Sequence, residues 1–264
     1  SVSYLFILYL YHCVAVRTPF LTYPTTMATE RHGQKIVRKY PFYAPIVAVL
    51  GDSQTKHLYH HFDFRSRSMP TMFVSRSGGR ILDFIEEVEQ LPASVRVLVL
   101  HCGTNDMPFA DPQLAISHYR RLLEKIRARG GIEMAVCTLV LPRSYNRRRP
   151  FIDRRREFQC NPRAFDFNHR LMQLCRRSPD LCYLDHGFHR RHPTQVLAAD
   201  SLHPNFEGVR AISYHLQDLL PHLLRQLPQR RADTPIQCGP HRRRQPPWND
   251  DDADGSHALK DKID

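Results

Sequence analysis

The sequence predicts an α/β fold in which a parallel sheet carries helices on both faces. Short apolar runs rich in Val, Ile and Leu alternate along the chain with longer segments of helical spacing. Unbroken apolar runs are typical of strands buried on both faces, and strand–helix alternation is typical of parallel sheets. In addition, three of four short polar motifs directly follow an apolar run, where the chemistry of such sheets gathers.

The apolar runs and the amphipathic spacing give the bounds of the expected elements in chain order. The expected strands are 45–50, 71–75, 95–100, 132–141 and 181–185. The expected helices are 55–62, 81–90, 112–129, 162–177 and 206–224. The pair Gly130-Gly131 is expected to end the third helix, because glycine favours the backbone conformation found just past a helix.

The chain of 264 residues is expected to divide into three parts. Residues 43–227 hold all the predicted elements, and residues 228–264 form a Pro-, Arg- and Asp-rich tail expected to be disordered. Residues 1–42 form an N-terminal extension whose apolar start is shorter than the about 20 residues of a membrane helix. The apolar run at 2–16 resembles the apolar region of a signal peptide. Met27 would also fit a translation start, in which case residues 1–26 would be part of a longer protein or lie outside the native frame.

Charge and cysteine content bear on partners and compartment. Lys and Arg exceed Asp and Glu by 12, which favours an anionic partner such as nucleic acid, an acidic membrane surface or a charged substrate. A soluble enzyme with Arg-rich loops and a basic tail explains the same charge. The seven cysteines show no zinc-like pairing, and their odd number favours a reducing, intracellular compartment, whereas a native signal peptide within residues 1–26 would imply secretion.

The motif Gly51-Asp52-Ser53 lies at the exit of the first predicted strand. A turn there would present the Ser53 hydroxyl to solvent, and a serine hydroxyl becomes a nucleophile when a base takes its proton. The motif also fits a turn with a helix-capping Asp or Ser.

The motif Asp200-Ser201-Leu202-His203 supplies a candidate base. In a short turn, Asp200 can reach the Nδ1 of His203, fix the imidazole tautomer and stabilise the charge that forms as Ser53 loses its proton. A helix N-cap followed by a surface histidine would leave the same pattern.

Two further motifs supply candidate donors for an oxyanion. The Asn105 amide, in the motif at 103–106, can donate to a developing negative charge. The backbone N–H groups of Ser53 and Gly78 can complete such a hole, with Gly79 as the competing choice. A flexible turn before a helix would also explain the paired glycines.

Taken in order, the four motifs resemble those of the SGNH hydrolases, also called the GDSL esterase/lipase superfamily, over about residues 43–224. The matching positions are Gly51-Asp52-Ser53, Gly78, Gly103-x-Asn105-Asp106 and Asp200-x-x-His203. The resemblance implies a three-layer α/β/α sandwich with a five-stranded parallel sheet of flavodoxin-like type. Two departures from the family pattern are Gln54, where many relatives have Leu, and the Arg and Ser neighbours of Gly78-Gly79.

The resemblance also implies roles and an activity. Ser53 would be the nucleophile, His203 the base and Asp200 the residue that orients it, with Ser53, Gly78 and Asn105 forming the oxyanion hole. The expected activity is hydrolysis of a carboxylic ester, with a short acyl or acetyl group, through an acyl-enzyme. We expect a monomer that needs no metal and no organic cofactor.

A different class of function fits the same sequence. Seven arginines lie within residues 143–156, after the fourth predicted strand. Because arginine pairs with carboxylate and phosphate, this segment can recruit an acidic substrate or nucleic acid. A solvated loop with no binding role would have the same arginine-rich composition. The chain would then be a catalytically weak or inactive SGNH-fold module that binds nucleic acid or protein. A weaker likeness is to esterase domains in the first open reading frame of some LINE-type retrotransposons.

Overall fold

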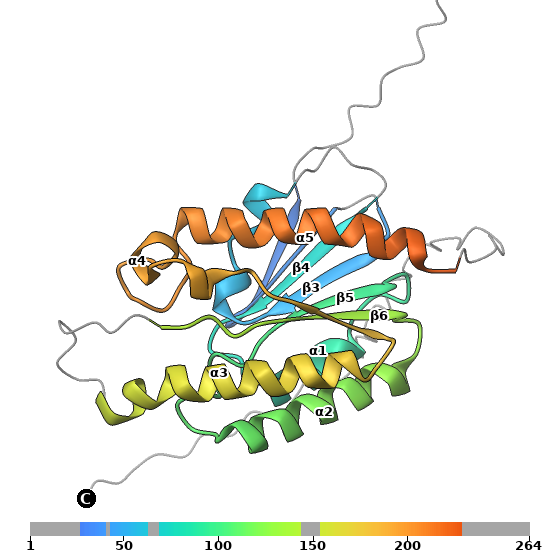
Figure 1. Cartoon of the computed structure of the whole chain (residues 1–264). Helices are drawn as coiled ribbons and strands as arrows, with labels where there is room; N and C mark the ends of the chain where they lie inside the picture. Colours follow the sequence, from blue (N-terminus) through green and yellow to red (C-terminus); the bar gives the residue numbers. More distant parts are fainter. Residues whose placement is uncertain (1–26, 41–42, 63–68, 144–153, 229–264) are drawn as a thin grey trace, which may run out of the picture. The chain divides into compact units, whose positions relative to one another are not determined.

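A computed structural model describes residues 27–40, 43–62, 69–143 and 154–228 of the chain. Within this part, seven strands form one sheet in the order β1-β2-β4-β3-β5-β6-β7 (Figure 1). The strands are β1 Ala28–His32, β2 Lys35–Lys39, β3 Val47–Gly51, β4 Thr71–Arg76, β5 Val97–His101, β6 Met134–Thr138 and β7 Leu181–Leu184. The five strands from β3 to β7 pair in parallel, as the sequence predicts, whereas β1 and β2 pair antiparallel.

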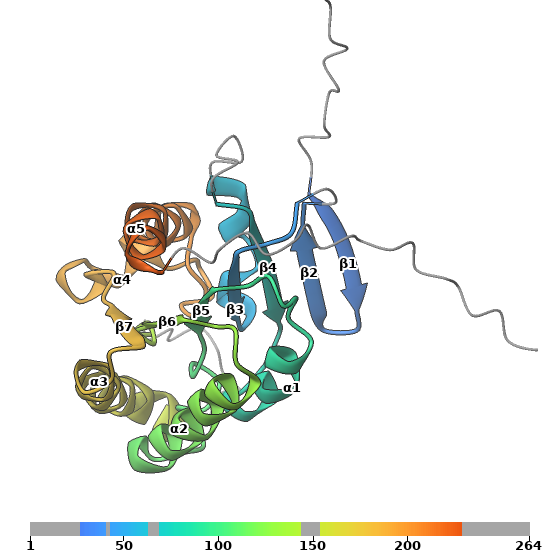
Figure 2. The ribbon, with the colours of Figure 1, turned by 90° about the vertical axis from the view of Figure 1, so that its right-hand side faces the viewer.

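Helices cover both faces of the sheet and complete the expected three-layer α/β/α sandwich (Figures 1 and 2). One face is covered by α1, α2 and α3, and the other by α4, α5 and the short 3-10 turns after β3. The α-helices are α1 Phe84–Glu89, α2 Pro112–Arg129, α3 Arg154–Arg176, α4 Pro193–Val196 and α5 Phe206–Gln226. The 3-10 helices are η1 Ser53–Thr55, η2 Leu58–His61, η3 Ile81–Asp83 and η4 Phe188–Arg190.

The strand residues alternate between two apolar cores, one on each face. In β3, Ala48 and Leu50 pack with α1 and α2, whereas Val47 and Val49 pack with α5. All four side chains are fully buried, which explains why the sequence shows an unbroken apolar run instead of alternation. The central strands are therefore fixed between two helical layers, and their carboxyl ends form a firm base for a site.

The N-terminal extension expected over residues 1–42 contributes two strands to the sheet. The hairpin of β1 and β2 lies at the edge of β4, where Lys35 pairs with Arg76 in register. Ile36 and Val37 are buried, but the strand sequence Lys-Ile-Val-Arg-Lys has only these two aliphatic residues between basic ones. Such a short apolar signal carries no clear period, so the sequence predicts five strands where the structure has seven.

The helix expected over residues 55–62 is wrong, because the chain forms the 3-10 helices η1 and η2 there. Side chains of α5 bind the carbonyls that a longer helix would use. Ser213 Oγ donates to the Leu58 carbonyl and Gln217 Nε2 donates to the His61 carbonyl, at 3.1 and 2.8 Å. The local pattern is overridden by packing against a helix from the other end of the domain.

The helix expected over residues 162–177 begins earlier, at Arg154, and passes through Pro162. Cys160 is buried on the same face as Ala164 and Phe167, so the apolar stripe extends the helix before the proline. The strand expected over 132–141 ends at Thr138, because the side chain of Asn168 in α3 binds both backbone groups of Val140.

The described part of the chain contains neither a candidate membrane span nor a candidate metal cluster. None of its helices combines the length and apolar character of a membrane span. Its His, Cys, Asp and Glu side chains also do not gather in threes in a way that could hold a metal ion. Cys102 and Cys137 are both buried among apolar side chains.

Candidate active site

The candidate site lies at the carboxyl ends of the parallel strands, where the order of the strands reverses. The chain passes from β3 to β4 on one side and later to β5 on the other side of β3. In open α/β sheets this reversal leaves a crevice beyond the strand ends, where ligands bind. Ser53 follows the last residue of β3, Gly51, by two positions, so its turn lies at this crevice.

Gly51 and Asp52 shape the turn that presents Ser53. A Cβ atom on Gly51 would lie 2.4 Å from the His101 carbonyl oxygen, so the close approach of β3 to β5 requires glycine here. The Asp52 carboxylate accepts from the Gln54 N–H at 2.9 Å and caps η1. The capping role considered for this Asp is therefore real, and it holds the turn that leaves Ser53 half-buried.

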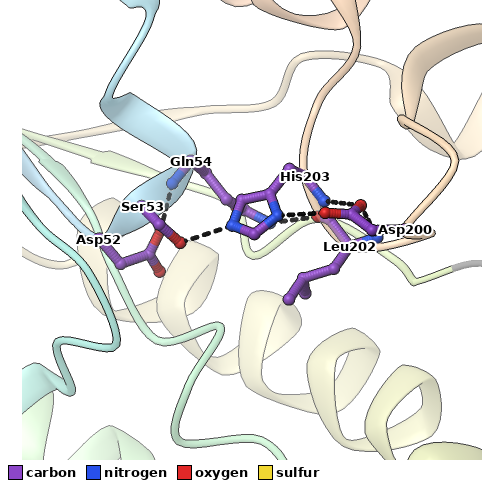
Figure 3. A network of polar contacts seen from close by, with 6 residues as sticks. All are labelled: Asp52, Ser53, Gln54, Asp200, Leu202 and His203. Atoms are coloured by element: carbon purple, nitrogen blue, oxygen red, sulfur yellow. Dashed lines mark hydrogen bonds and ion pairs between the residues drawn. The ribbon is translucent and has the colours of Figure 1, made fainter.

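The segment between α4 and α5 brings His203 and Asp200 to Ser53 (Figure 3). His203 Nε2 lies 2.7 Å from Ser53 Oγ, and His203 Nδ1 lies 2.5 Å from Asp200 Oδ2. The second carboxylate oxygen, Oδ1, accepts the backbone N–H groups of Leu202 and His203 at 3.0 and 2.9 Å. Hydroxyl, imidazole and carboxylate thus lie in series across a separation of 150 residues.

The first turn of α5 supports this loop. Asn205 caps α5 by accepting from the Gly208 N–H at 2.9 Å, and its Nδ2 donates back to the Leu197 carbonyl. A Cβ atom on Gly208 would lie 2.2 Å from the Val196 carbonyl oxygen, so the helix approaches the loop too closely for any larger residue. The loop is therefore seated directly on α5.

Electrostatics at Asp200 favour an ionised carboxylate. Burial raises the pKa of the Asp200 carboxyl, but hydrogen bonds from the His203 ring and from two backbone N–H groups outweigh burial and lower the pKa to about 2. The carboxylate therefore accepts the Nδ1–H of His203, which leaves the lone pair on Nε2, facing Ser53. This tautomer is the one that can take a proton from a hydroxyl.

The two glycines of the second motif differ in their hydrogen bonds. Gly79 N–H donates to the Arg76 carbonyl at 3.1 Å, whereas Gly78 N–H has no acceptor among the described residues. Gly78 has a φ of 72°, which favours glycine, and Gly79 packs so closely that a Cβ atom would lie 2.9 Å from Phe84 Cζ. Of the two choices left open by the sequence, Gly78 retains an N–H that can donate to an oxyanion.

Asn105 links the third motif to the second. Its Nδ2 donates to the Gly79 carbonyl at 3.0 Å, and the neighbouring Asp106 accepts from the Ile81 N–H at 3.0 Å. These two bonds hold the turn after β4 against the loop after β5. The second N–H of the Asn105 amide has no acceptor within the described ranges and stays available for a ligand.

The part of the chain from β3 to α5 matches the sequence profile of a known protein family. The sequence profile described as the GDSL-like Lipase/Acylhydrolase family matches residues 49–211, a span that includes all four motifs. The chain belongs to this family. As a GDSL-type, or SGNH, protein it is a carboxylic ester hydrolase in its general class. A search of curated proteins finds no match.

Solved structures show the same SGNH hydrolase fold. A GDSL-like lipase from Bacteroides thetaiotaomicron superposes with a TM-score of 0.55 at 16% identity, over 69% of this chain and 93% of that chain. A carbohydrate esterase of family 3 from Talaromyces cellulolyticus gives a TM-score of 0.53 at 15% identity, over 69% and 99%. An acetyl esterase mutant solved with an acetate ion gives 0.52 at 14% identity, over 68% and 97%.

The structure of this GDSL-type hydrolase also brings together two residues whose contact the sequence does not reveal. Gln54 and His101 form a buried polar chain that leads to the backbone of Leu202, next to His203. The signals were present, since Gln54 departs from the family pattern and His101 ends an apolar run. Their meeting could not be foreseen, because it depends on the pairing of β3 with β5.

The Arg-rich segment is described only in part. Arg143 donates to the Thr104 carbonyl at 2.6 Å, and its own backbone is bound on both sides by the Asn161 side chain. The segment therefore starts beside the loop that carries Asn105. Of the expected anionic contact over 143–156, residues 144–153 lie outside the described residues, as does the tail from residue 229, whereas Arg154–Arg156 form the start of α3.

Proposed function

We propose that the chain cleaves esters of short acyl groups, acetyl esters above all, through an acyl-enzyme on Ser53. The observation that carries the proposal is the series from Ser53 Oγ through His203 to Asp200, at 2.7 and 2.5 Å. The short acyl group is supported by structures of the same fold whose descriptions name an acetyl esterase and a carbohydrate esterase.

The geometry supports a two-step reaction. Ser53 Oγ bonds to the ester carbonyl carbon while His203 Nε2 takes the hydroxyl proton, and the resulting imidazolium is stabilised by Asp200. As the bond to the alcohol breaks, His203 returns this proton to the leaving oxygen. Water, deprotonated by the same imidazole, then attacks the acyl-enzyme, and Ser53 leaves with its proton restored while the acid departs.

Three donors would hold the oxyanion of each tetrahedral intermediate. They are the N–H groups of Ser53 and Gly78, and the amide of Asn105 that is already fixed by the Gly79 carbonyl. A preorganised donor of this kind typically contributes about 3 kcal/mol to the lowering of the barrier. A fixed amide is useful because no reorganisation is needed when the negative charge develops.

The test is a p-nitrophenyl ester series with the wild-type chain and the variants Ser53→Ala and His203→Ala. We expect acetate to be cleaved faster than longer acyl esters, and each variant to lose at least about a thousandfold in kcat/KM. A fluorophosphonate probe should label the wild type and leave Ser53→Ala unlabelled. Ser117→Ala, which removes an exposed hydroxyl bonded to the Leu114 carbonyl on α2, is the matched control.

Full activity in purified Ser53→Ala would refute the assigned nucleophile. A wild-type chain that neither reacts with the probe nor cleaves any ester, yet binds RNA or DNA with steep salt dependence, would favour a nucleic-acid binding module instead. That second candidate draws on the net charge of +12 and on Arg143 beside the Asn105 loop.

A further inference from the structure

Gln54 follows the proposed nucleophile and is 3% exposed, with polar partners at both ends of its amide. Its Nε2 donates to the Leu202 carbonyl at 2.9 Å. Its Oε1 lies 3.2 Å from Thr104 Oγ1 and 3.0 Å from His101 Nε2. A buried amide needs an acceptor for its NH₂ group and a donor for its oxygen, so these contacts fix which way the Gln54 amide faces.

The peptide unit between Leu202 and His203 is held at both of its polar ends (Figure 3). Its carbonyl accepts from Gln54 Nε2, and its N–H donates to Asp200 Oδ1 at 2.9 Å. This peptide unit leads directly to the Cα atom of His203, so its orientation sets where the imidazole lies relative to Ser53. Gln54 thus acts on the base without contacting the reacting atoms.

His101 orients the Gln54 amide through its oxygen, at the end opposite to the Nε2 that binds Leu202. Burial lowers the pKa of His101 to about 4, so its imidazole is neutral near pH 7 and carries one proton. Gln54 Oε1 can only accept, so we assign this proton to Nε2. Nδ1 then accepts the single proton of the Thr138 hydroxyl at 2.6 Å, in preference to the Leu100 carbonyl, which lies 3.1 Å from the same hydroxyl. Thr138 and His101 end the neighbouring strands β6 and β5, which anchors the chain of bonds in the centre of the sheet.

The loop itself shows why an external anchor is useful. Ser201 has a φ of 63°, a left-handed conformation that non-glycine residues keep only where the surroundings hold them. Asp200 and Gln54 bind the Leu202–His203 peptide unit, one residue beyond Ser201, from opposite ends. Without the contact from Gln54, the Leu202 carbonyl would have no hydrogen-bond donor among the described residues, and only Asp200 would hold this peptide unit.

We propose that Gln54 is a positioning residue, which clamps the Leu202–His203 peptide unit and so keeps the imidazole aligned with Ser53. The proposal rests on the roles given to Ser53 and His203 under the proposed function. A leucine at position 54 could neither donate to the Leu202 carbonyl nor accept from His101.

The first test is Gln54→Leu in the full chain, assayed with p-nitrophenyl acetate. Since a small displacement of a catalytic group can cost about a hundredfold, we expect kcat to fall by about 10- to 100-fold, with KM within about twofold of wild type. The rate of fluorophosphonate labelling of Ser53 should fall by the same factor, because both reactions need His203 to take the Ser53 proton. Wild-type kcat and labelling rate in Gln54→Leu would overturn the clamp while leaving the proposed function intact.

The second test, Gln54→Glu, keeps the size of the side chain and has a readout that a loss of packing would not change. Burial next to Asp52 should raise the pKa of the introduced carboxyl, so it is protonated in acid and ionised at higher pH. Only the protonated form can donate to the Leu202 carbonyl. We therefore expect the ratio of kcat/KM in the variant to that in wild type to rise as the pH falls. A ratio independent of pH would overturn the proposal, even if Gln54→Leu fails to fold.

Gln217→Leu is the matched control. Gln217 Nε2 also donates to a backbone carbonyl, that of His61, but this bond joins α5 to η2 and does not involve the loop of His203. The control should lose stability, with kcat within about twofold of wild type. A loss of kcat in the control equal to that in Gln54→Leu would show a general effect of loosened packing and contradict the clamp.

Discussion

Two carboxyls beside the Ser53 turn are held in surroundings that disfavour their charge. Burial is the largest cause that raises the pKa of Asp52 and of Asp106 to about 6 each. Each carboxyl also binds a backbone N–H, of Gln54 and of Ile81, so both shape the turns of the site. At the scale of single residues, the geometry of the site is therefore maintained at the expense of stability near neutral pH.

The sign of this effect at Asp52 follows from the two states. Between about pH 4 and about pH 6 the carboxyl is ionised in the unfolded chain but protonated in the fold, so a rising pH favours unfolding. Asp52→Asn removes this dependence, and its side-chain oxygen can still cap Gln54 N–H. As the pH rises from about 4 to about 6, the free energy of unfolding of the variant minus that of wild type should increase by up to about 3 kcal/mol. Urea unfolding at several pH values measures the difference, and a difference constant with pH would contradict the prediction.

The residues that meet within the site differ in how far the sequence reveals them. Asp200 and His203 were predictable as a pair, because three residues of spacing in a turn allow one side chain to reach the other. Their meeting with Ser53 followed from the family pattern and is confirmed as a contact at 2.7 Å, while their chemical roles stay predictions. The contact of Asn105 with Gly79 depends on how two loops lie against each other, which no local pattern records.

At the scale of elements, the turn between β4 and η3 determines where the two proposed oxyanion donors Gly78 and Asn105 lie. Gly79 closes this turn through its N–H and receives Asn105 on its carbonyl. Gly78 needs its left-handed φ, but only Gln34 Oε1, at 3.8 Å, lies near the place of a Cβ atom. The two glycines therefore have separate reasons to be glycine, close packing at Gly79 and backbone conformation at Gly78.

Alanine at each position should separate these reasons. In Gly79→Ala the new methyl would lie 2.9 Å from Phe84 Cζ and 3.1 Å from the Arg76 carbonyl oxygen, so the turn must shift and displace Asn105. We expect a stability loss of about 1–3 kcal/mol together with a fall in kcat of about tenfold or more.

Gly78→Ala should lose about 1–2 kcal/mol of stability because of its left-handed φ. It keeps its backbone N–H, so kcat should stay within about threefold of wild type. Thermal unfolding measures the stability of both variants, and ester kinetics measures their kcat. A wild-type kcat in Gly79→Ala would refute the displacement of Asn105.

Elements with a strong local period were predicted well, and those defined by distant contacts were not. The bounds of α2 match the expected 112–129, because its stripe of apolar residues begins at an Asp cap and ends at Gly130. The segment 55–62 carried a helical pattern but formed η1 and η2, since Ser213 and Gln217 of α5 bind its carbonyls. Sequence separation, more than residue type, marks the boundary of what could be predicted.

At the scale of the whole domain, β1 and β2 protect one edge of the parallel sheet. Backbone pairing of β2 covers β4 over Phe73–Arg76, and Ile36 and Val37 bury their side chains. Lys35 forms an ion pair with the buried Glu87 of α1, which also lies 3.5 Å from Arg76. An uncovered β4 would expose unpaired backbone groups and leave Glu87 with a single, longer contact to a cation.

A chain that begins at residue 43, the boundary expected from the sequence, should therefore be less stable than one that begins at residue 27. Fully burying an aliphatic side chain contributes about 1.5–3 kcal/mol, so loss of Ile36 and Val37 alone should lower the free energy of unfolding by about 3 kcal/mol or more. The total stability of such a domain is only about 5–15 kcal/mol, so the shorter chain should also associate through its free β4 edge. Urea unfolding and light scattering compare the two chains. Equal stability in a monomeric shorter chain would show that the hairpin is dispensable, and the domain would then begin where the apolar period of the sequence begins.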